Sequence, residues 1–149
     1  VHGKVALFLE DETKPENGYG TQDGDTIGLR ISSASDAHSA FYIPGCAQID
    51  EALKQRLAGA DCLLFDGTVY TDDEMITAGV GTKTGARMGH VYISGAGGSL
   101  AALADLGIGK RIYVHINNTN PILDAASPEH AAVTREGWKV AFDGMEIRL

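Results

Sequence analysis

The chain has 149 residues, of which 44% are hydrophobic, so it can bury the core of one globular domain. Twenty acidic against twelve basic residues give a formal net charge of −8, which would repel phosphate backbones and anionic bilayers and argues against a nucleic-acid partner. No apolar run approaches the roughly 18 residues that a membrane span needs, which excludes a transmembrane protein.

The first third of the chain has the composition of an antiparallel β region. Residues 5–10 predict a strand, and residues 11–25, which are polar and contain glycine and proline, predict an exposed loop. Residues 26–32 alternate in the manner of a half-buried strand, and residues 40–43 form another short apolar run.

From residue 49 onward the predicted strands alternate with helices. Apolar residues recur every four positions over residues 49–57, which predicts an amphipathic helix with Gly59 as its C-cap. Residues 62–65 predict a buried strand, and residues 71–74 have the spacing of a capping box that begins a short helix.

The stretch 79–98 holds seven glycines in twenty residues, which is too many for regular structure throughout, so we expect a functional loop there. Residues 91–100 lack the complete G-x-G-x-x-G spacing of a dinucleotide site, and residues 79–84 lack the residue order of a Walker loop. A nucleotide site is therefore not the favoured interpretation.

The last third predicts three more elements and a terminal hairpin. These are a helix over residues 99–106 that Gly107 stops, a strand over 111–116, a helix that begins at Ser127-Pro128-Glu129 and ends at Gly137, and a hairpin of residues 138–142 and 145–149 around Asp143-Gly144. The whole pattern is that of a mixed α/β (α+β) sheet without repeats or linkers, so residues 1–149 form a single unit.

Polar residues that follow apolar strands are the candidates for chemistry, because ligands collect at the carboxyl ends of strands in such sheets. Asp66 closes one strand, His115 lies near the end of another, and His90 lies in the glycine-rich loop. Two histidines and a carboxylate form the facial triad that holds iron(II) with open coordination positions. The alternatives stay open: Asp66 as a turn former before Gly67, His115 as a core histidine, and His90 as a loop residue without function.

Five segments carry a resemblance to a known family: Phe65-Asp66-Gly67-Thr68, Thr71-Asp72-Asp73-Glu74-Met75, Lys83-Thr84-Gly85 with Met88-Gly89-His90, His115-Ile116-Asn117-Asn118-Thr119-Asn120-Pro121, and Gly137-Trp138 with Phe142-Asp143-Gly144-Met145-Glu146. Together they resemble the pyrroloquinoline quinone synthesis protein B family of the metallo-β-lactamase superfamily. The resemblance covers essentially all of this chain and about the C-terminal half of that family's length.

The resemblance implies a metallo-β-lactamase-like αββα sandwich, of which this chain is about one half: a mixed sheet with helices on one face. The first residue is Val1 and not methionine, which also fits a part of a longer protein. We therefore expect the N-terminal half of the same protein as the partner on an exposed apolar face, with a homodimer as the further option.

The resemblance also implies a metal centre. His115 matches the superfamily's last metal-binding histidine, His90 is expected as a nearby ligand, and Asp66 completes the catalytic set. Iron(II) is the expected metal and zinc the alternative, with most ligands in the N-terminal half. The superfamily's bridging aspartate is replaced by Pro44-Gly45-Cys46, which argues against a two-metal hydrolase such as a β-lactamase.

Five polar residues are expected to bind substrate. Lys83 and Arg87 are available to a substrate carboxylate, and the others are Asn117, Asn118 and Asn120. We also expect one of these asparagines to bind the second ring nitrogen of His115 and so to set its tautomer.

The resembled family takes part in pyrroloquinoline quinone (PQQ) biosynthesis. We expect an iron-dependent oxygenase that hydroxylates the tyrosine ring of a peptide-derived Glu-Tyr precursor, and the alternative is a carrier of PQQ or its precursor toward the periplasm. Few basic residues lie near the site, which favours the oxygenase over a carrier of an anionic quinone. Cys46 and Cys62 form no disulfide or zinc motif, which favours the reducing cytoplasm.

Overall fold

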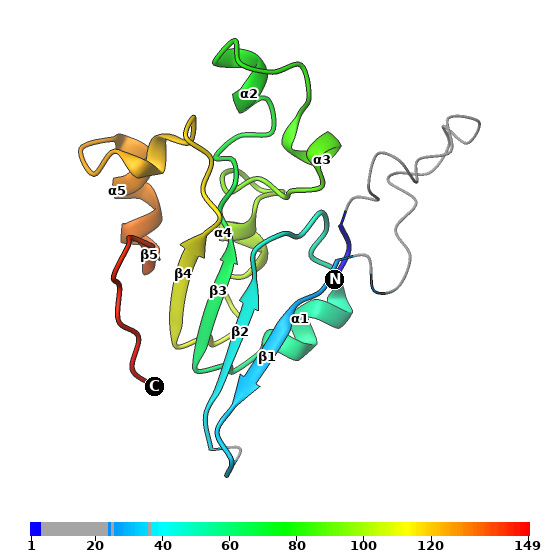
Figure 1. The fold of residues 1–149 in the computed structure, drawn as a ribbon, viewed down its shortest axis with the longest axis vertical. Coiled ribbons are helices and arrows are strands. Elements are labelled where there is room, and N and C mark those ends of the chain that lie inside the picture. The colour runs from blue at the N-terminus through cyan, green and yellow to red at the C-terminus, as the bar shows by residue number, and fades with distance from the viewer. Residues whose placement is uncertain (4–23, 25, 36) are drawn as a thin grey trace.

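A five-stranded mixed sheet forms the centre of the computed structural model, which describes residues 1–3, 24, 26–35 and 37–149 (Figure 1). In spatial order its strands are β1 (Leu29–Ser32), β2 (Ser39–Ile43), β3 (Cys62–Asp66), β4 (Lys110–Val114) and β5 (Trp138–Val140). β1 is antiparallel to β2, and every other neighbouring pair is parallel. The mixed α/β sheet is confirmed, whereas the strand predicted over residues 5–10 lies outside the described residues.

Short helices connect the strands. They are α1 (Glu51–Leu57), α2 (Glu74–Thr77), α3 (Gly85–Met88), α4 (Ser99–Ala102), the 3-10 helix η2 (Pro121–Leu123) and α5 (Pro128–Arg135). Capping side chains define where the two longest begin: Asp50 accepts a hydrogen bond from the Leu53 amide, and Ser127 from the His130 amide. None of the helices in the described part of the chain combines the length and the apolar composition of a membrane-spanning segment.

One face of the sheet is covered by helices, as predicted. Leu53 and Leu57 of α1 and Val133 of α5 belong to the same buried cluster as Leu63 and Phe65 of β3. Side chains of successive strand residues point to opposite faces, so these alternate residues of β3 define the covered face. At about 25 cal/mol per Å², burial of apolar surface here is the main source of stability.

The opposite face has a smaller cluster, which contains Ala40, Cys62 and Ile112 and is partly covered by residues 141–147. Towards the β1 edge it is open, and Leu29 and Ile31 are 47% and 58% exposed. The half-buried state predicted for residues 26–32 is therefore wrong for β1, whose four residues are all exposed. The exposed apolar face that we expected is therefore present at the β1 edge of the sheet.

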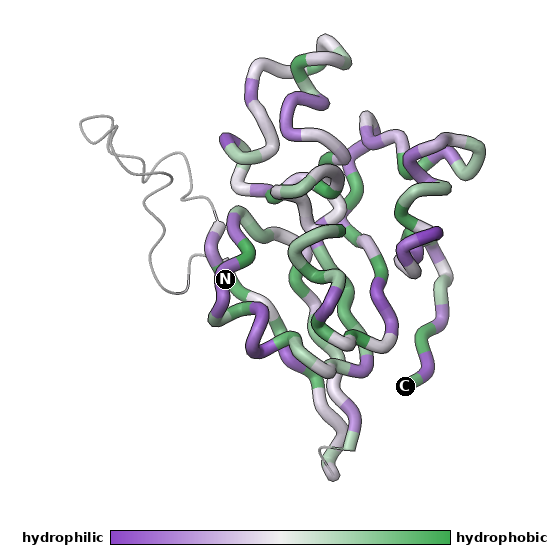
Figure 2. Tube along the Cα trace, turned by 180° about the vertical axis from the view of Figure 1, so that it is seen from behind, coloured by the Kyte–Doolittle hydropathy of each residue, from purple (hydrophilic) through white to green (hydrophobic). Residues whose placement is uncertain are grey.

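The predicted terminal hairpin is wrong. β5 pairs in parallel with β4, and the chain turns at Gly144, where the Met145 amide donates to the Phe142 carbonyl at 3.1 Å. Residues 145–149 then form no strand. Met145 and Ile147 pack instead against the smaller cluster, so their alternation reflects burial against the sheet face and not pairing with β5. Figure 2 shows this alternation of hydrophilic and hydrophobic residues toward the C-terminus.

Two other elements are shorter than predicted. The helix that starts at Ser99 ends at Ala102, and the Leu106 carbonyl accepts a hydrogen bond from the Gly59 amide at 2.8 Å in place of continuing the helix. β4 ends at Val114, because His115 adopts a left-handed backbone conformation with a φ of 53°. A residue in that conformation cannot continue a strand.

The parallel arrangement of β2, β3 and β4 directs their carboxyl ends to one end of the sheet, where the segments with α2 and α3 lie (Figure 1). The register pairs Asp66 of β3 with Val114 of β4. Gly67 allows the close approach of the two chains, because a Cβ there would lie 2.9 Å from the Tyr113 Cβ. The ends of the two strands thus bring Asp66 and His115 together.

Candidate metal site

Asp66 is fully buried at the end of β3, and its carboxylate accepts four hydrogen bonds. Oδ2 accepts from the Cys46 amide at 2.8 Å and faces His90 Nδ1 at 2.8 Å. Oδ1 accepts from the Thr68 amide at 3.1 Å and from the Thr68 hydroxyl at 2.6 Å. A carboxylate offers about four lone-pair sites, so these groups compensate the loss of water around the buried charge.

His115 follows β4 and is the only non-glycine residue with positive φ in the part of the chain that the structure describes. Backbone strain of this kind costs of the order of 1–3 kcal/mol and is concentrated at functional sites. The side chain is exposed, and its Nδ1 lies 2.8 Å from the Thr68 hydroxyl. The strand and this contact together direct the ring toward Asp66.

His90 comes from the glycine-rich loop and not from a strand. Gly89 ends α3 with a φ of 87°, a conformation that favours glycine, and the His90 amide then donates to the Gly85 carbonyl at 3.0 Å. The next amide, of Val91, donates to the Cys46 carbonyl at 2.6 Å. These contacts tie the loop to the segment after β2 and place the His90 ring, which is 19% exposed, beside Asp66.

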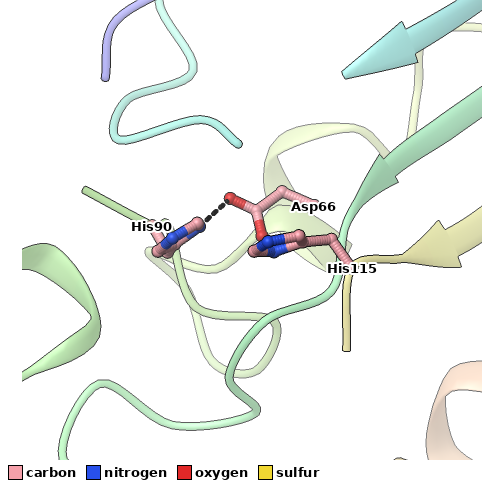
Figure 3. Close-up of side chains that lie close together, drawn as sticks. All are labelled: Asp66, His90 and His115. Carbon is pink, nitrogen blue, oxygen red and sulfur yellow. Dashed lines mark hydrogen bonds and ion pairs between the residues drawn. The ribbon is translucent and has the colours of Figure 1, made fainter. Parts of the chain in front are cut away.

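The three predicted site residues come together in space (Figure 3). One potential ligand atom of Asp66, one of His90 and one of His115 lie within 4.8 Å of one another. The two imidazole rings are stacked, with centroids 5.2 Å apart and an interplanar angle of 20°. Imidazole nitrogens beside a carboxylate are a donor set that suits zinc and iron.

Thr68 is the site residue that the sequence interpretation missed. Its hydroxyl oxygen lies within 3.0 Å of Asp66 Oδ1, His90 Nδ1 and His115 Nδ1, and it is 6% exposed. The available signal was its position two residues after Asp66, since an aspartate commonly binds the backbone amide two residues on. That spacing predicts the turn but not the contacts with the two histidines.

The asparagines after His115 have other partners than predicted. Asn120 is buried, and it donates to the Gly67 carbonyl at 2.8 Å and accepts from the Ile122 amide. Asn117 donates to the Met75 sulfur. The expectation that an asparagine binds the second ring nitrogen of His115 is therefore wrong, because the Thr68 hydroxyl occupies that place.

The remaining predicted substrate residues lie on the surface. Arg87 is in α3, Lys83 precedes that helix, and Asn118 follows β4 three residues after His115. All three are exposed. Their contact with substrate stays a prediction.

Cys46 lies in the segment where the superfamily's bridging aspartate was expected. Its amide holds Asp66, and its thiol donates to the Gln48 carbonyl at 3.2 Å. Burial, and after it the charge of Asp66, raises the pKa of the Cys46 thiol to about 12. The thiol therefore stays protonated at neutral pH, and this segment stabilises the carboxylate of the neighbouring strand without supplying one itself.

Comparison with known proteins gives one family match. The family model described as "Beta-lactamase superfamily domain" matches residues 5–116. Proteins named coenzyme PQQ synthesis protein B from Methylobacterium nodulans and Rhodopseudomonas palustris are 56% and 51% identical to the chain over 149 residues. The alignments cover 100% of the chain and 48% of each relative, so the chain spans about half the length of these curated relatives.

A solved structure agrees with these matches. The crystal structure of Zn²⁺-bound PqqB from Methylobacterium extorquens superposes with a TM-score of 0.91 at 53% sequence identity. The superposition covers 100% of the chain and 48% of that protein. The expected resemblance, in fold and in extent, is confirmed.

Proposed function

Because the chain belongs to the beta-lactamase superfamily, we propose that its His90 and His115 contribute to a divalent-metal site in a protein of PQQ biosynthesis. The observation that carries the proposal is the approach of both imidazoles to a buried carboxylate at the carboxyl end of the sheet. The names of the relatives supply the pathway, and the zinc in a similar structure supports the metal.

The residues of this chain fit such a group. The carboxylate of Asp66 is held by two backbone amides and a hydroxyl, so its orientation is fixed and it can orient His90. Metal-bound histidines generally donate their other ring N–H to an oxygen partner, and Asp66 and Thr68 provide these oxygens here. His90 and His115 would hold the ion, and the exposed side of His115 leaves access for substrate.

We propose iron(II) as the metal and hydroxylation of the tyrosine ring of a Glu-Tyr precursor as the reaction. Bound iron(II) would supply the activation of oxygen that this hydroxylation needs, with zinc as an inactive substitute. Lys83 and Arg87 on the rim would attract the carboxylates of the substrate, since guanidinium and ammonium groups pair with them. The protein chain itself would hold and orient the ring and exclude water.

The remaining ligands and the partner follow from the same proposal. The exposed side chains of Leu29, Ile31 and Tyr42 form an apolar face, and the relatives have about twice the length of this chain. We propose that the N-terminal half packs on this face and completes the metal site. Two imidazoles without further ligands hold iron(II) only weakly in water. We therefore expect stoichiometric iron binding only in the completed site.

The test is anaerobic reconstitution of the full-length protein with iron(II), followed by addition of oxygen and a Glu-Tyr peptide. The proposal predicts about one iron per protein and a hydroxylated tyrosine product by mass spectrometry, and a zinc-loaded sample is the control without turnover. Binding of PQQ or its precursor without any turnover would contradict the oxygenase and favour the carrier.

A further inference from the structure

The Thr68 hydroxyl lies between Asp66 and the two imidazoles, and the positions of its neighbours determine where the protons are. It has one hydrogen and two lone pairs. Four polar atoms surround it: Asp66 Oδ1 at 2.6 Å, His115 Nδ1 at 2.8 Å, and His90 Nδ1 and the His115 carbonyl oxygen at 3.0 Å. Only one of these atoms can accept its hydrogen at full strength.

The shortest contact decides the direction of the hydroxyl. If the hydrogen pointed at His115, a lone pair of Thr68 would face the charged oxygen of Asp66 at 2.6 Å. Two acceptors at that distance repel each other, while a hydroxyl donating to a carboxylate is a strong hydrogen bond at that length. The Thr68 hydrogen therefore points to Asp66.

The direction of the Thr68 hydroxyl and the position of Asp66 then determine the tautomer of both imidazoles. His115 Nδ1 faces a lone pair of Thr68 at 2.8 Å, so this nitrogen carries a hydrogen and donates it. His90 Nδ1 faces Asp66 Oδ2 at 2.8 Å, and the same reasoning places a hydrogen there. Each neutral ring is left with its lone pair on Nε2, which is the atom that can bind a cation.

We infer that Thr68 is a positioning residue that sets the tautomer of His115, and that Asp66 serves the site by orienting His90 and Thr68 and not by binding the metal. All four lone-pair sites of Asp66 are already used within the protein. The role of these tautomers in metal binding rests on the proposed function. The tautomers themselves are a property of the metal-free protein and can be measured there.

The experiment compares variants of the full-length protein. Thr68→Val keeps the shape of the side chain and removes the hydroxyl, and Thr68→Ser restores it. Thr119→Val is the matched control, because Thr119 also donates to a buried carboxylate at 2.6 Å, that of Glu74, outside the cluster. Thr68→Ala serves as the second variant should Thr68→Val fail to fold.

The first readout is the ¹⁵N spectrum of the imidazoles in metal-free protein. We expect the wild type, Thr68→Ser and Thr119→Val to have the Nδ1–H tautomer at His115. In Thr68→Val His115 shifts toward the Nε2–H tautomer, while His90, which donates to Asp66, does not. An unchanged His115 tautomer in Thr68→Val and Thr68→Ala would overturn the inference.

The second readout is zinc affinity by competition with a chelator. We expect a loss of about 10- to 100-fold in Thr68→Val, the usual effect of removing an outer partner of a metal-bound histidine. Thr68→Ser and Thr119→Val should stay within a few-fold of the wild type. A wild type that binds no zinc would contradict the proposed function, but the tautomer measurement would still decide the role of Thr68.

Discussion

Two buried carboxylates lie in neighbouring parts of the described structure, and only one of them has histidines beside it. Asp66 and Glu74 are 0% and 7% exposed, and each accepts a hydrogen bond of 2.6 Å from a threonine hydroxyl. Asp66 also accepts from two backbone amides, and Glu74 from one. Beside Asp66 stand two histidines, whereas Glu74 binds only the Thr119 hydroxyl and the Tyr70 amide among the contacts described.

The histidines beside Asp66 distinguish a carboxylate of the candidate site from a carboxylate with a structural role. The Glu74 contacts connect the start of α2 to the segments around Tyr70 and Thr119, so that carboxylate stabilises the loops at this end of the sheet. The Asp66 contacts include His90 Nδ1, which leaves Nε2 of the same ring free to bind a cation. A buried, fully bonded carboxylate is therefore not by itself a functional site, and the imidazoles give this one its role.

The largest difference between the two carboxylates should appear when each one is neutralised. Asp66→Asn should lower zinc affinity of the full-length protein by about 10- to 100-fold, because His90 loses the partner that orients it. Glu74→Gln is the matched control and should leave the affinity unchanged. Equal losses in both variants, measured by chelator competition, would mean that the two carboxylates have the same, purely structural role.

The free energy of unfolding, unlike zinc affinity, should not distinguish the surroundings of Asp66 from those of Glu74. Thr68→Val and Thr119→Val each leave a buried carboxylate with one hydrogen bond fewer, which costs about 1–3 kcal/mol in the free energy of unfolding. Urea denaturation of the metal-free protein should therefore give similar losses for both variants. A loss confined to Thr68→Val would contradict the equal contribution of the two hydroxyl groups to stability.

The two exposed cations of the glycine-rich loop that carries His90 should have a smaller effect. Lys83→Ala and Arg87→Ala each remove an exposed charge worth about 0.2–1 kcal/mol to a bound carboxylate, so the KM for a Glu-Tyr peptide should rise about twofold for each. Lys139→Ala, an exposed lysine of β5, is the control. Unchanged kinetics in both loop variants would remove these residues from the substrate site.

The smallest effect concerns Cys46, whose amide holds Asp66. Because burial raises the pKa of its thiol to about 12, the thiolate is scarce at pH 7–9, and the side chain is also shielded from reagents. Peptide mass spectrometry after treatment of native protein with iodoacetamide should find Cys46 unmodified across this pH range, with full modification in urea. Rapid native labelling at pH 8 would contradict the packing around Asp66.

Much of the site could be predicted from the sequence, for a reason that also explains what was missed. Asp66 and His115 directly follow apolar runs, and neighbouring parallel strands bring such residues to one edge of the sheet. His90 depended on its loop and on the family resemblance. The role of Thr68 depends on the register between β3 and β4, which no local pattern encodes.

The errors in the predicted fold also arise because a local pattern does not specify tertiary partners. Alternation at Met145 and Ile147 indicates that one side of the segment is buried, but it does not say whether a strand or a sheet face lies opposite. The alternation in β1 likewise predicted burial of one side, yet all four of its residues are exposed. The sequence pattern thus predicted the elements well and their partners less well, since partners are set by tertiary packing.

The most direct test of the metal site is the metal content of the full-length protein after anaerobic reconstitution with iron(II). His115→Ala and His90→Ala should each abolish stoichiometric iron and the hydroxylation of a Glu-Tyr peptide, with the fold retained by circular dichroism. His38→Ala, which replaces an exposed histidine that pairs with Asp61, should keep both. Full metal content and turnover in His115→Ala would contradict the account.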